Sequence, residues 1–560
     1  MRKIKVTDPI LMEVINNNLL SIADQTGITL IKCAFSPNIK ERRDCSTALL
    51  DAKGRVVAQA AYIPGHLGNM LDVGKEILKK YGKNIHEGDT FINNDPYLGG
   101  SSHLSDWTVT TPIFHENKLM FFSSNTAHHV DVGGRVPGST SPDNKSIFEE
   151  GIRIPLVKIV EKGKPNEEII DLITWNCRDP QERKLDLNGQ IAANIVGKKN
   201  CIELCKKYGN KSLESSIEMI LNYTENKIRG KINELPDGDY EFINYLDDDG
   251  IEKDEMVPIK AKVTIKGSNI KFDFTGSGKQ ARGALNSVRC GTLSAVYYVM
   301  MSMIAPDILP NDGLFRVPEV YAPIGTILNP RPGAAVSTRL DTKQRLSGVL
   351  IGALNQALPL ERRIAGSNST GSCFIFYGYD QKREKDYTYV ESIGGGSGAR
   401  FSKDGLDGVQ VHITNTSNQP VESVESEYPL IIENYSFIND SCGSGKFRGG
   451  LGIRRDIRPI YEFGLTTRVE GTKTKPWGIN GGKEGSPSKI ILNPGPNETN
   501  LPPKQGDIRL KAGNIVSLRT PGAGGFGDPL ERDRKLIIKD IEEEKITVLK
   551  AKNDYNFIKK

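Results

Sequence analysis

Apolar residues recur at helical spacing near the N-terminus, and this pattern predicts a helix over residues 9–23. Asp8 is a suitable N-cap for this helix and Pro9 fits its first turn. Gly27 fits the stop signal of the same helix. We therefore expect a single helix as the first element of the fold.

Strand patterns follow the first helix. Residues 47–59 predict a strand, a turn and a second strand. Residues 107–114 and 119–127 predict two more strands, joined by a hairpin turn at residues 116–118. Pro112 has no N–H group, so it predicts an edge position for the first strand of this hairpin.

Helical and strand patterns alternate in the remaining chain. Residues 186–233 predict helix, and residues 286–304 predict a long buried helix. Residues 261–274 alternate apolar with polar side chains around a turn, which predicts a hairpin with one solvated face. The charged tail has helical spacing around residues 536–541.

Composition excludes several classes of partner. The net charge of +5 is small for 560 residues and gives no argument for nucleic acid or an anionic membrane. No apolar stretch approaches the ~20 residues of a membrane-spanning helix. The basic N-terminal residues are not followed by an apolar segment, so no secretory signal is predicted. We expect a cytoplasmic protein.

The cysteines and the glycine-rich loops add little chemistry. The eight cysteines are scattered and form no Cys-x-x-Cys pair, which fits a reduced environment. Cys201 and Cys205 lie four residues apart on an expected helix, and we interpret them as packing residues. Residues 276–279 and 443–446 match a phosphate-binding loop only in part, because no Ser or Thr follows the lysine.

Two clusters of imidazole and carboxylate side chains carry the candidate chemistry. Of the seven histidines, four fall between residues 103 and 129. His103 and Asp106 precede the first strand of the predicted hairpin, whereas His128, His129 and Asp131 follow the second. A hairpin sets the start of one strand beside the end of the other, so both clusters should meet at one end of the sheet. Such ligands bind Zn, Mn or Fe(II), which predicts a catalytic metal centre with open coordination positions.

Other residues of the same types have simpler explanations. The charge run that contains Asp44 is typical of a solvated face, so the pattern alone assigns Asp44 no role. His66 enters a predicted helix as a cap neighbour or as a site residue, and the pattern leaves both open. His86 and His412 are interpreted as structural residues, and His115 as exposed.

The expected fold class is α+β, in a mixed multi-domain chain. A metal-bearing N-terminal α/β half is followed by a glycine-rich, β-rich C-terminal half. The expected domains are residues 1–235, which carry the metal site and a helical segment, and residues 236–530, which are β-rich. Residues 531–560 form a charged helical tail. This division suits the usual size of domains.

Several long segments resemble the B component of the hydantoinase and 5-oxoprolinase group. Its relatives include the N-methylhydantoinase, caprolactamase and acetone or acetophenone carboxylase subunits. The similarity extends from about Asp8 to about Pro529. The matching segments are residues 39–44, 63–68, 94–100, 103–106, 329–330, 412–418, 427–429 and 521–529.

The resemblance implies a division of labour between two subunits. An A-type subunit binds ATP and phosphorylates the substrate, which fits the lack of a complete phosphate-binding loop in this chain. The B component holds the metal and completes the chemistry. The motif positions imply four metal ligands: Asp44, His103, Asp106 and His128.

The resemblance also gives roles to neighbouring residues. His129 and Asp131 become candidates for orienting a metal ligand, because a ligating imidazole needs an oriented partner, or for proton transfer. His66, Asn94 and Asp95 become candidates for positioning the substrate.

Two positions depart from the family pattern. Cys45 and Cys442 stand where an aromatic residue and a glycine are expected. A thiol beside Asp44 either shifts metal preference toward a softer ion or packs as a small apolar residue, and we favour packing.

Three functions are compatible with the resemblance. The favoured hypothesis is the metal-dependent subunit of an ATP-dependent cyclic-amide hydrolase, which opens hydantoin, 5-oxoproline or another lactam. The second is a subunit of an ATP-dependent ketone carboxylase. The third is a non-catalytic scaffold for the A subunit.

Overall fold

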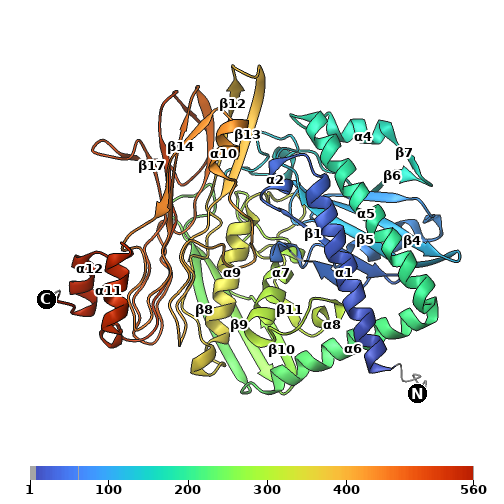
Figure 1. The fold of residues 1–560 in the computed structure, drawn as a ribbon, viewed down its shortest axis with the longest axis horizontal. Coiled ribbons are helices and arrows are strands. Elements are labelled where there is room, and N and C mark those ends of the chain that lie inside the picture. The colour runs from blue at the N-terminus through green and yellow to red at the C-terminus, as the bar shows by residue number, and fades with distance from the viewer. Residues whose placement is uncertain (1–7, 61, 559–560) are drawn as a thin grey trace.

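A computed structural model of the chain describes residues 8–60 and 62–558. It confirms the mixed α+β class, because long helices pack against four β-sheets in the described residues (Figure 1). The segment before Asp8, on which the expectation about a secretory signal rests, lies outside the described residues. Over the described ranges, no helix combines the length and the apolar character needed to span a bilayer.

A seven-stranded antiparallel sheet, ordered β2-β1-β5-β4-β3-β6-β7, contains the strands predicted before residue 130. Its strands are β1 (Cys45–Asp51), β2 (Val56–Ala60), β3 (Thr90–Asn93), β4 (Asp106–His115), β5 (Lys118–His128), β6 (Val157–Glu161) and β7 (Lys164–Pro165). The β4–β5 hairpin is confirmed. Its turn residues Glu116 and Asn117 have φ values of 52° and 58°, as a tight hairpin turn requires.

The edge position predicted from Pro112 is wrong, because β4 lies between β5 and β3. Strand β3 is short and pairs with β4 only from Thr108 to Thr110. Pro112 therefore lies beyond the end of β3, where its missing N–H group interrupts no pairing with that strand.

The first helix, α1 (Pro9–Cys33), is longer than its sequence pattern predicts. Asp8 caps it as expected, accepting a hydrogen bond from the backbone N–H of Ile10 at 2.9 Å. Gly27 does not end the helix. A Cβ at this position would lie 2.4 Å from Cε2 of Tyr62, so this glycine allows a close approach of the Tyr62 ring.

Helices cover one face of the seven-stranded sheet, and the central core covers the other. Helix α1 packs on β1 and β2, while α5 (Pro180–Tyr208) packs on β4 and β5, and α6 (Asn210–Asn233) packs beside α1 (Figure 1). Leu49 joins this helical side, whereas its neighbour Leu50 joins the central core. Burial on both faces explains why these strands show little alternation of apolar and polar residues.

The central core forms around a second sheet, ordered β11-β10-β9-β8, and two helices. Its strands are β8 (Gly238–Leu246), β9 (Val257–Lys266), β10 (Asn269–Asp273) and β11 (Glu319–Tyr321). The predicted hairpin is β9–β10, and β9 alternates buried with half-buried residues. The predicted buried helix becomes α7 (Arg289–Val299) with a π-helical end, and α7 packs against α9 (Arg339–Leu354).

Two further sheets, ordered β13-β12-β16-β19 and β14-β15-β20-β17-β18, form the strand-rich C-terminal part. Their strands are β12 (Cys373–Asp380), β13 (Lys385–Ser392), β14 (Leu430–Phe437), β15 (Ile453–Pro459), β16 (Phe463–Arg468), β17 (Lys489–Leu492), β18 (Thr499–Asn500), β19 (Lys504–Leu510) and β20 (Val516–Arg519). The remaining α-helices are α2 (Pro37–Lys40), α3 (Val73–Tyr81), α4 (Glu167–Thr174), α8 (Asp312–Phe315), α10 (Val421–Glu427), α11 (Arg534–Glu542) and α12 (Val548–Tyr555). Helix α11 confirms the helical pattern of the tail, and the division into domains stays a prediction.

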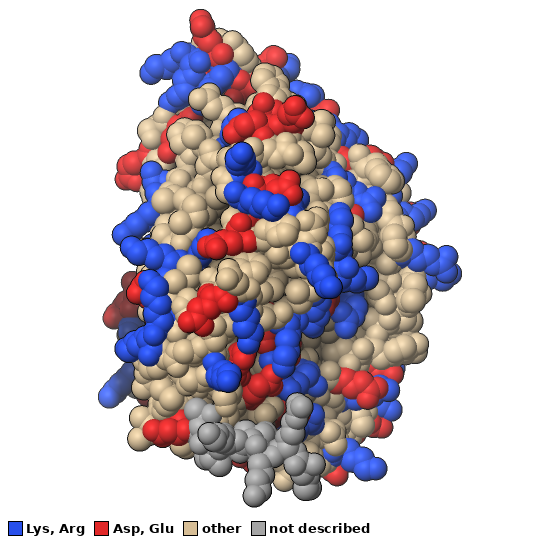
Figure 2. Space-filling view, turned by 90° about the vertical axis from the view of Figure 1, so that its right-hand side faces the viewer, with Lys and Arg blue, Asp and Glu red and all other residues tan. Residues whose placement is uncertain are grey.

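Charged side chains of both signs are interspersed on the molecular face shown in Figure 2. This distribution agrees with the small net charge of the chain.

Replacing Gly197 of α5 with leucine should destabilise the fold by about 1–3 kcal/mol through overpacking. A Cβ at Gly197 would lie 2.4 Å from Oγ of Ser123 on β5, so the glycine sets the distance between α5 and the sheet. Gly230→Ala on α6 is the control, because no atom lies within 4 Å of the added Cβ. It should stabilise the helix by about 0.5–1 kcal/mol. Urea denaturation measures the free energy of unfolding of both variants. Equal changes in this free energy would contradict the packing argument.

Candidate metal centre

The candidate centre lies at one end of the seven-stranded sheet, where three adjacent strands align their residues. Cys45 on β1, Ala127 on β5 and Trp107 on β4 lie opposite one another and form the last row (rung) of paired residues that runs across all three strands. One step farther, Asp106 pairs with His128, whose N–H donates to the carbonyl oxygen of Asp44 at 3.0 Å. Side chains alternate between faces of a sheet, so these three residues share the face opposite to the Cys45 rung.

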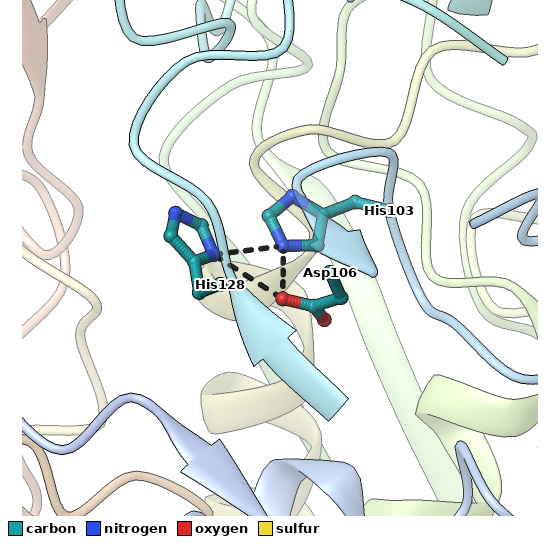
Figure 3. Close-up of side chains that lie close together, drawn as sticks. All are labelled: His103, Asp106 and His128. Atoms are coloured by element: carbon teal, nitrogen blue, oxygen red, sulfur yellow. Dashed lines mark hydrogen bonds and ion pairs between the residues drawn. The ribbon is translucent and has the colours of Figure 1, made fainter. Parts of the chain in front are cut away.

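His103, Asp106 and His128 form a compact cluster at this end of the sheet (Figure 3). Nε2 of His103 lies 2.8 Å from Oδ1 of Asp106, and Nδ1 of His128 lies 3.2 Å from both atoms. His103 and Asp106 are almost fully buried. The prediction that the two sequence clusters meet is therefore confirmed for these three residues.

The second carboxylate oxygen of Asp106 faces a polar environment. Arg339 of α9 lies 3.1 Å from this oxygen, and Asn69 donates to it at 3.5 Å. His66 approaches the same oxygen to 3.7 Å through Nε2, while its Nδ1 lies 3.1 Å from Oγ of Ser46. Asp106 therefore links the imidazole cluster to the guanidinium of Arg339.

Asp106 and His103 have the protonation states that metal ligands need. Burial raises the pKa of Asp106, but His103 and Arg339 outweigh it and hold this pKa well below its ordinary value. Burial, followed by Arg339, lowers the pKa of His103 well below its ordinary value. Burial also lowers the pKa of His66. An ionised carboxylate and neutral imidazoles are the forms that bind metal ions.

A cavity of about 60 Å³ opens beside the cluster. It lies where the end of the seven-stranded sheet meets α9 and strands β12, β13 and β16. Asp44, His66, His103 and His128 line its sheet side, together with Arg42. The other sides are lined by Arg339, Leu340, Lys343, Cys373, Ile375, Val390, Ser392, Ile413, Thr414, Thr416 and Arg468, among others.

Asp44 and His66 share this cavity but do not belong to the compact cluster of three. Asp44 is half-buried at the same rung as His128. His66 lies at the end of the short 3-10 helix η1 (Pro64–His66) and is almost fully buried.

His129 and Asp131 lie outside the cavity lining. His129 stacks on Trp107 with a centroid distance of 3.9 Å, and its Nε2 lies 3.0 Å from Oε1 of Gln190. Asp131 accepts hydrogen bonds from the backbone N–H groups of Gly133 and Gly138 and pairs with Arg178 at 2.8 Å. Both residues therefore organise the loop after β5.

Asn94 and Asp95 also lie outside the cavity lining. Asn94 donates to the carbonyl oxygens of Leu104 and Ile152. Asp95 forms an ion pair with Arg153 at 2.8 Å. The substrate-positioning role expected for this pair would act through the loop that carries His103.

The cations of the cavity are the residues that the sequence analysis missed. Arg339 and Lys343 lie one turn apart on α9 and are both buried, as are Arg42 and Arg468. One signal was present: several charged residues begin a helix whose continuation from Leu346 is apolar. Charges on a helix that is otherwise buried indicate a functional or ion-paired face.

The two unusual cysteines pack as small apolar residues. Cys45 lies in a buried cluster with Leu30, Ile39 and Ala127. Cys442 packs in the cluster that anchors the C-terminal helices, and burial raises its pKa to about 11.

The fold and the cluster define a class: an α+β protein with a carboxylate–imidazole cluster that could hold a metal ion, buried beside a cation-lined cavity. More specifically, the chain belongs to the Hydantoinase B/oxoprolinase family, whose model matches residues 8–529. An uncharacterized protein of Methanocaldococcus jannaschii is 39% identical over 552 residues, which cover 98% of this chain and 96% of that protein.

Two solved structures share the fold. The ATP-dependent caprolactamase from Pseudomonas jessenii matches with a TM-score of 0.93 and 29% identity, covering 99% of this chain and 97% of that chain. A nucleotide-free acetone carboxylase structure matches with a TM-score of 0.91 over 100% of this chain and 81% of that chain. Its 20% identity supports likeness of fold alone.

Arg339→Leu should destabilise the protein by about 3–5 kcal/mol, because it leaves the buried carboxylate of Asp106 without its cationic partner. Urea denaturation with a chelator present measures this loss, since no added cation can then replace the guanidinium. The control is Arg282→Leu, which breaks a surface pair with Asp249. That change should cost less than about 1 kcal/mol. Equal losses would contradict the assigned role of Arg339.

Glu150→Gln should change the pH dependence of stability. Buried Glu150 accepts hydrogen bonds from the N–H groups of Val336 and Ser337, just before α9, and burial raises its pKa to about 8. The folded wild type then binds a proton that the unfolded chain lacks between pH 4.5 and about 8. This group therefore lowers stability by about 1 kcal/mol per pH unit as pH rises through that range. Parallel denaturation curves at several pH values should show this slope in the wild type and its loss in the variant.

Proposed function

We propose that this chain is the metal-dependent subunit of an ATP-dependent cyclic-amide hydrolase. It would open the ring of a hydantoin, 5-oxoproline or another lactam after an A-type partner subunit has phosphorylated the carbonyl oxygen with ATP. Membership of the Hydantoinase B/oxoprolinase family and the likeness to an ATP-dependent caprolactamase support this function. The observation that carries it is the convergence of His103, Asp106 and His128 beside a buried cavity.

The donor set fits a divalent ion. Neighbouring ligand atoms of a tetrahedral ion lie ~3.4 Å apart when each is ~2.1 Å from the metal. The three facing atoms of His103, Asp106 and His128 are separated by 2.8–3.2 Å. Two imidazole nitrogens that face each other and one carboxylate oxygen suit Zn, Mn or Fe(II). Asp44 shares the cavity and is the candidate for a fourth ligand.

A bound ion would act as a Lewis acid and lower the pKa of a coordinated water molecule. The residues of the chain would do the remaining work. Arg339 keeps Asp106 ionised, and His66 is a neutral imidazole that lines the cavity and can receive a proton. Ring opening places the hydroxyl of water on the carbonyl carbon and a proton on the ring nitrogen as the bond between them breaks. The resulting acyl phosphate then reacts with a second water molecule to give the free carboxylate and inorganic phosphate.

The roles of His129 and Asp131 stay a proposal, and their positions outside the cavity lining support orientation of a ligand over proton transfer. Both would orient the strand end that carries His128 without contacting substrate. Trp107 and Gln190 hold the imidazole of His129 on the far face of the sheet.

His103→Ala, assayed with the A-type partner, should lose ATP-coupled ring opening by at least about 100-fold, because the ion would lose a ligand. Release of the open-chain amino acid and the metal content of the purified chain are measured together. His86→Ala is the matched control, since His86 contacts Asn84 outside the cavity. Full activity in the His103 variant would contradict the proposal. ATP turnover that requires bicarbonate would instead indicate carboxylation of a ketone.

A further inference from the structure

Two buried cations in the cavity lack the carboxylate partner that other buried cations have. The described residues include ten buried lysine and arginine side chains. Eight of them form ion pairs with carboxylates: Arg183, Arg339, Arg345, Arg448, Arg455, Arg468, Lys504 and Arg532. Arg42 and Lys343 have no such pair within the described part of the chain, and both line the same cavity.

The donors of these two cations are only partly used. Nζ of Lys343 donates to the carbonyl oxygen of Gly65 at 3.2 Å, which leaves further N–H groups available. Nη1 of Arg42 donates to Oδ1 of Asn38 and to the carbonyl oxygen of Val390. The buried Nε of Arg42 has no hydrogen-bond partner among the described residues.

Glycines make room for the lysine. A Cβ at Gly65 would lie 3.3 Å from Nζ of Lys343, and a Cβ at Gly291 would lie 3.0 Å from its Cδ. Any larger residue at either position would therefore crowd the side chain of Lys343.

Unpaired buried charge is costly. Burial, followed by the nearby Arg339, lowers the pKa of Lys343 to about 7. The lowered pKa disfavours the ammonium form of Lys343, and an anion bound beside it would favour that form. Two cations match the charge of phosphate more closely than that of a single carboxylate, and a guanidinium and an ammonium that line one cavity offer several donors to phosphate oxygens.

We propose that Arg42 and Lys343 form an oxyanion subsite that receives the phosphoryl group of the activated amide. This inference rests on the proposed function, because the phosphorylated substrate is what brings the phosphoryl group into the cavity. The subsite holds that group beside the imidazole cluster, and it selects phosphorylated over unactivated amides.

Inorganic phosphate is the probe, added to the purified chain without its partner. Isothermal titration should show binding to the wild type, and phosphate should raise its thermal midpoint. Lys343→Met and Arg42→Gln should each weaken binding by about 10-fold or more, the loss of a charge-assisted hydrogen bond. Lys199→Met, which removes an exposed lysine outside the cavity, should bind like the wild type.

Two further variants separate recognition from packing. Lys343→Arg keeps the charge and should retain more phosphate binding than Lys343→Met. Without phosphate, Lys343→Met should be at least as stable as the wild type, because it removes an unpaired buried charge. A purely structural lysine would instead make this variant less stable.

The subsite assignment is overturned if the wild type does not bind phosphate, if both cation variants bind it normally, or if acetate binds as tightly as phosphate. His103→Ala should retain phosphate binding, so this measurement is independent of ring opening. Ring opening without a phosphate site would refute the subsite alone. Phosphate binding that depends on Arg42 and Lys343, without any ring opening, would refute the proposed function instead.

Discussion

The alignment of three adjacent strands is the constraint on which the whole centre depends. Strands β1, β5 and β4 end together, so Asp44, His128 and Asp106 reach the same level although they are far apart in sequence. Because side chains alternate along each strand, polar residues lie on one face of the sheet and apolar residues on the other. Asp44 and His128 line the cavity and Asp106 shares their face of the sheet, while Trp107 and Cys45 pack into apolar surroundings.

The hairpin half of this centre could be predicted from sequence because its cause is local. The turn at Glu116–Asn117 fixes which residues of β4 and β5 face each other, and that pairing brings Asp106 to His128. The sequence-based predictions were wrong where the contact that decides the structure involves a residue far away in the chain. Gly27 is a helix stop by local rules, but the ring of Tyr62 gives it a packing role inside α1.

Most cations of the cavity could not be predicted, because Arg339, Lys343 and Arg468 come from segments far along the chain from the β4–β5 hairpin. Helix α9 is buried between the second sheet and the N-terminal part of the fold (Figure 1). No local pattern shows that Arg339 will meet Asp106 while Lys343, one turn later, forms no ion pair with a carboxylate of the described residues. Only the packed fold distinguishes a charge that stabilises a neighbour from a charge that stays available for a ligand.

The β4–β5 hairpin also restricts how the chain can vary. One extra residue in the paired part of either strand would shift the side chains between it and the centre to the opposite face. It would place Trp107 where Asp106 now stands, or Ala127 where His128 now stands. The ladder already contains an irregularity between Ile113 and Phe114, close to the turn. Insertions and deletions are therefore tolerable only near the turn. The number of paired residues between the turn and the centre must stay constant, whereas the sequence of the turn itself can change.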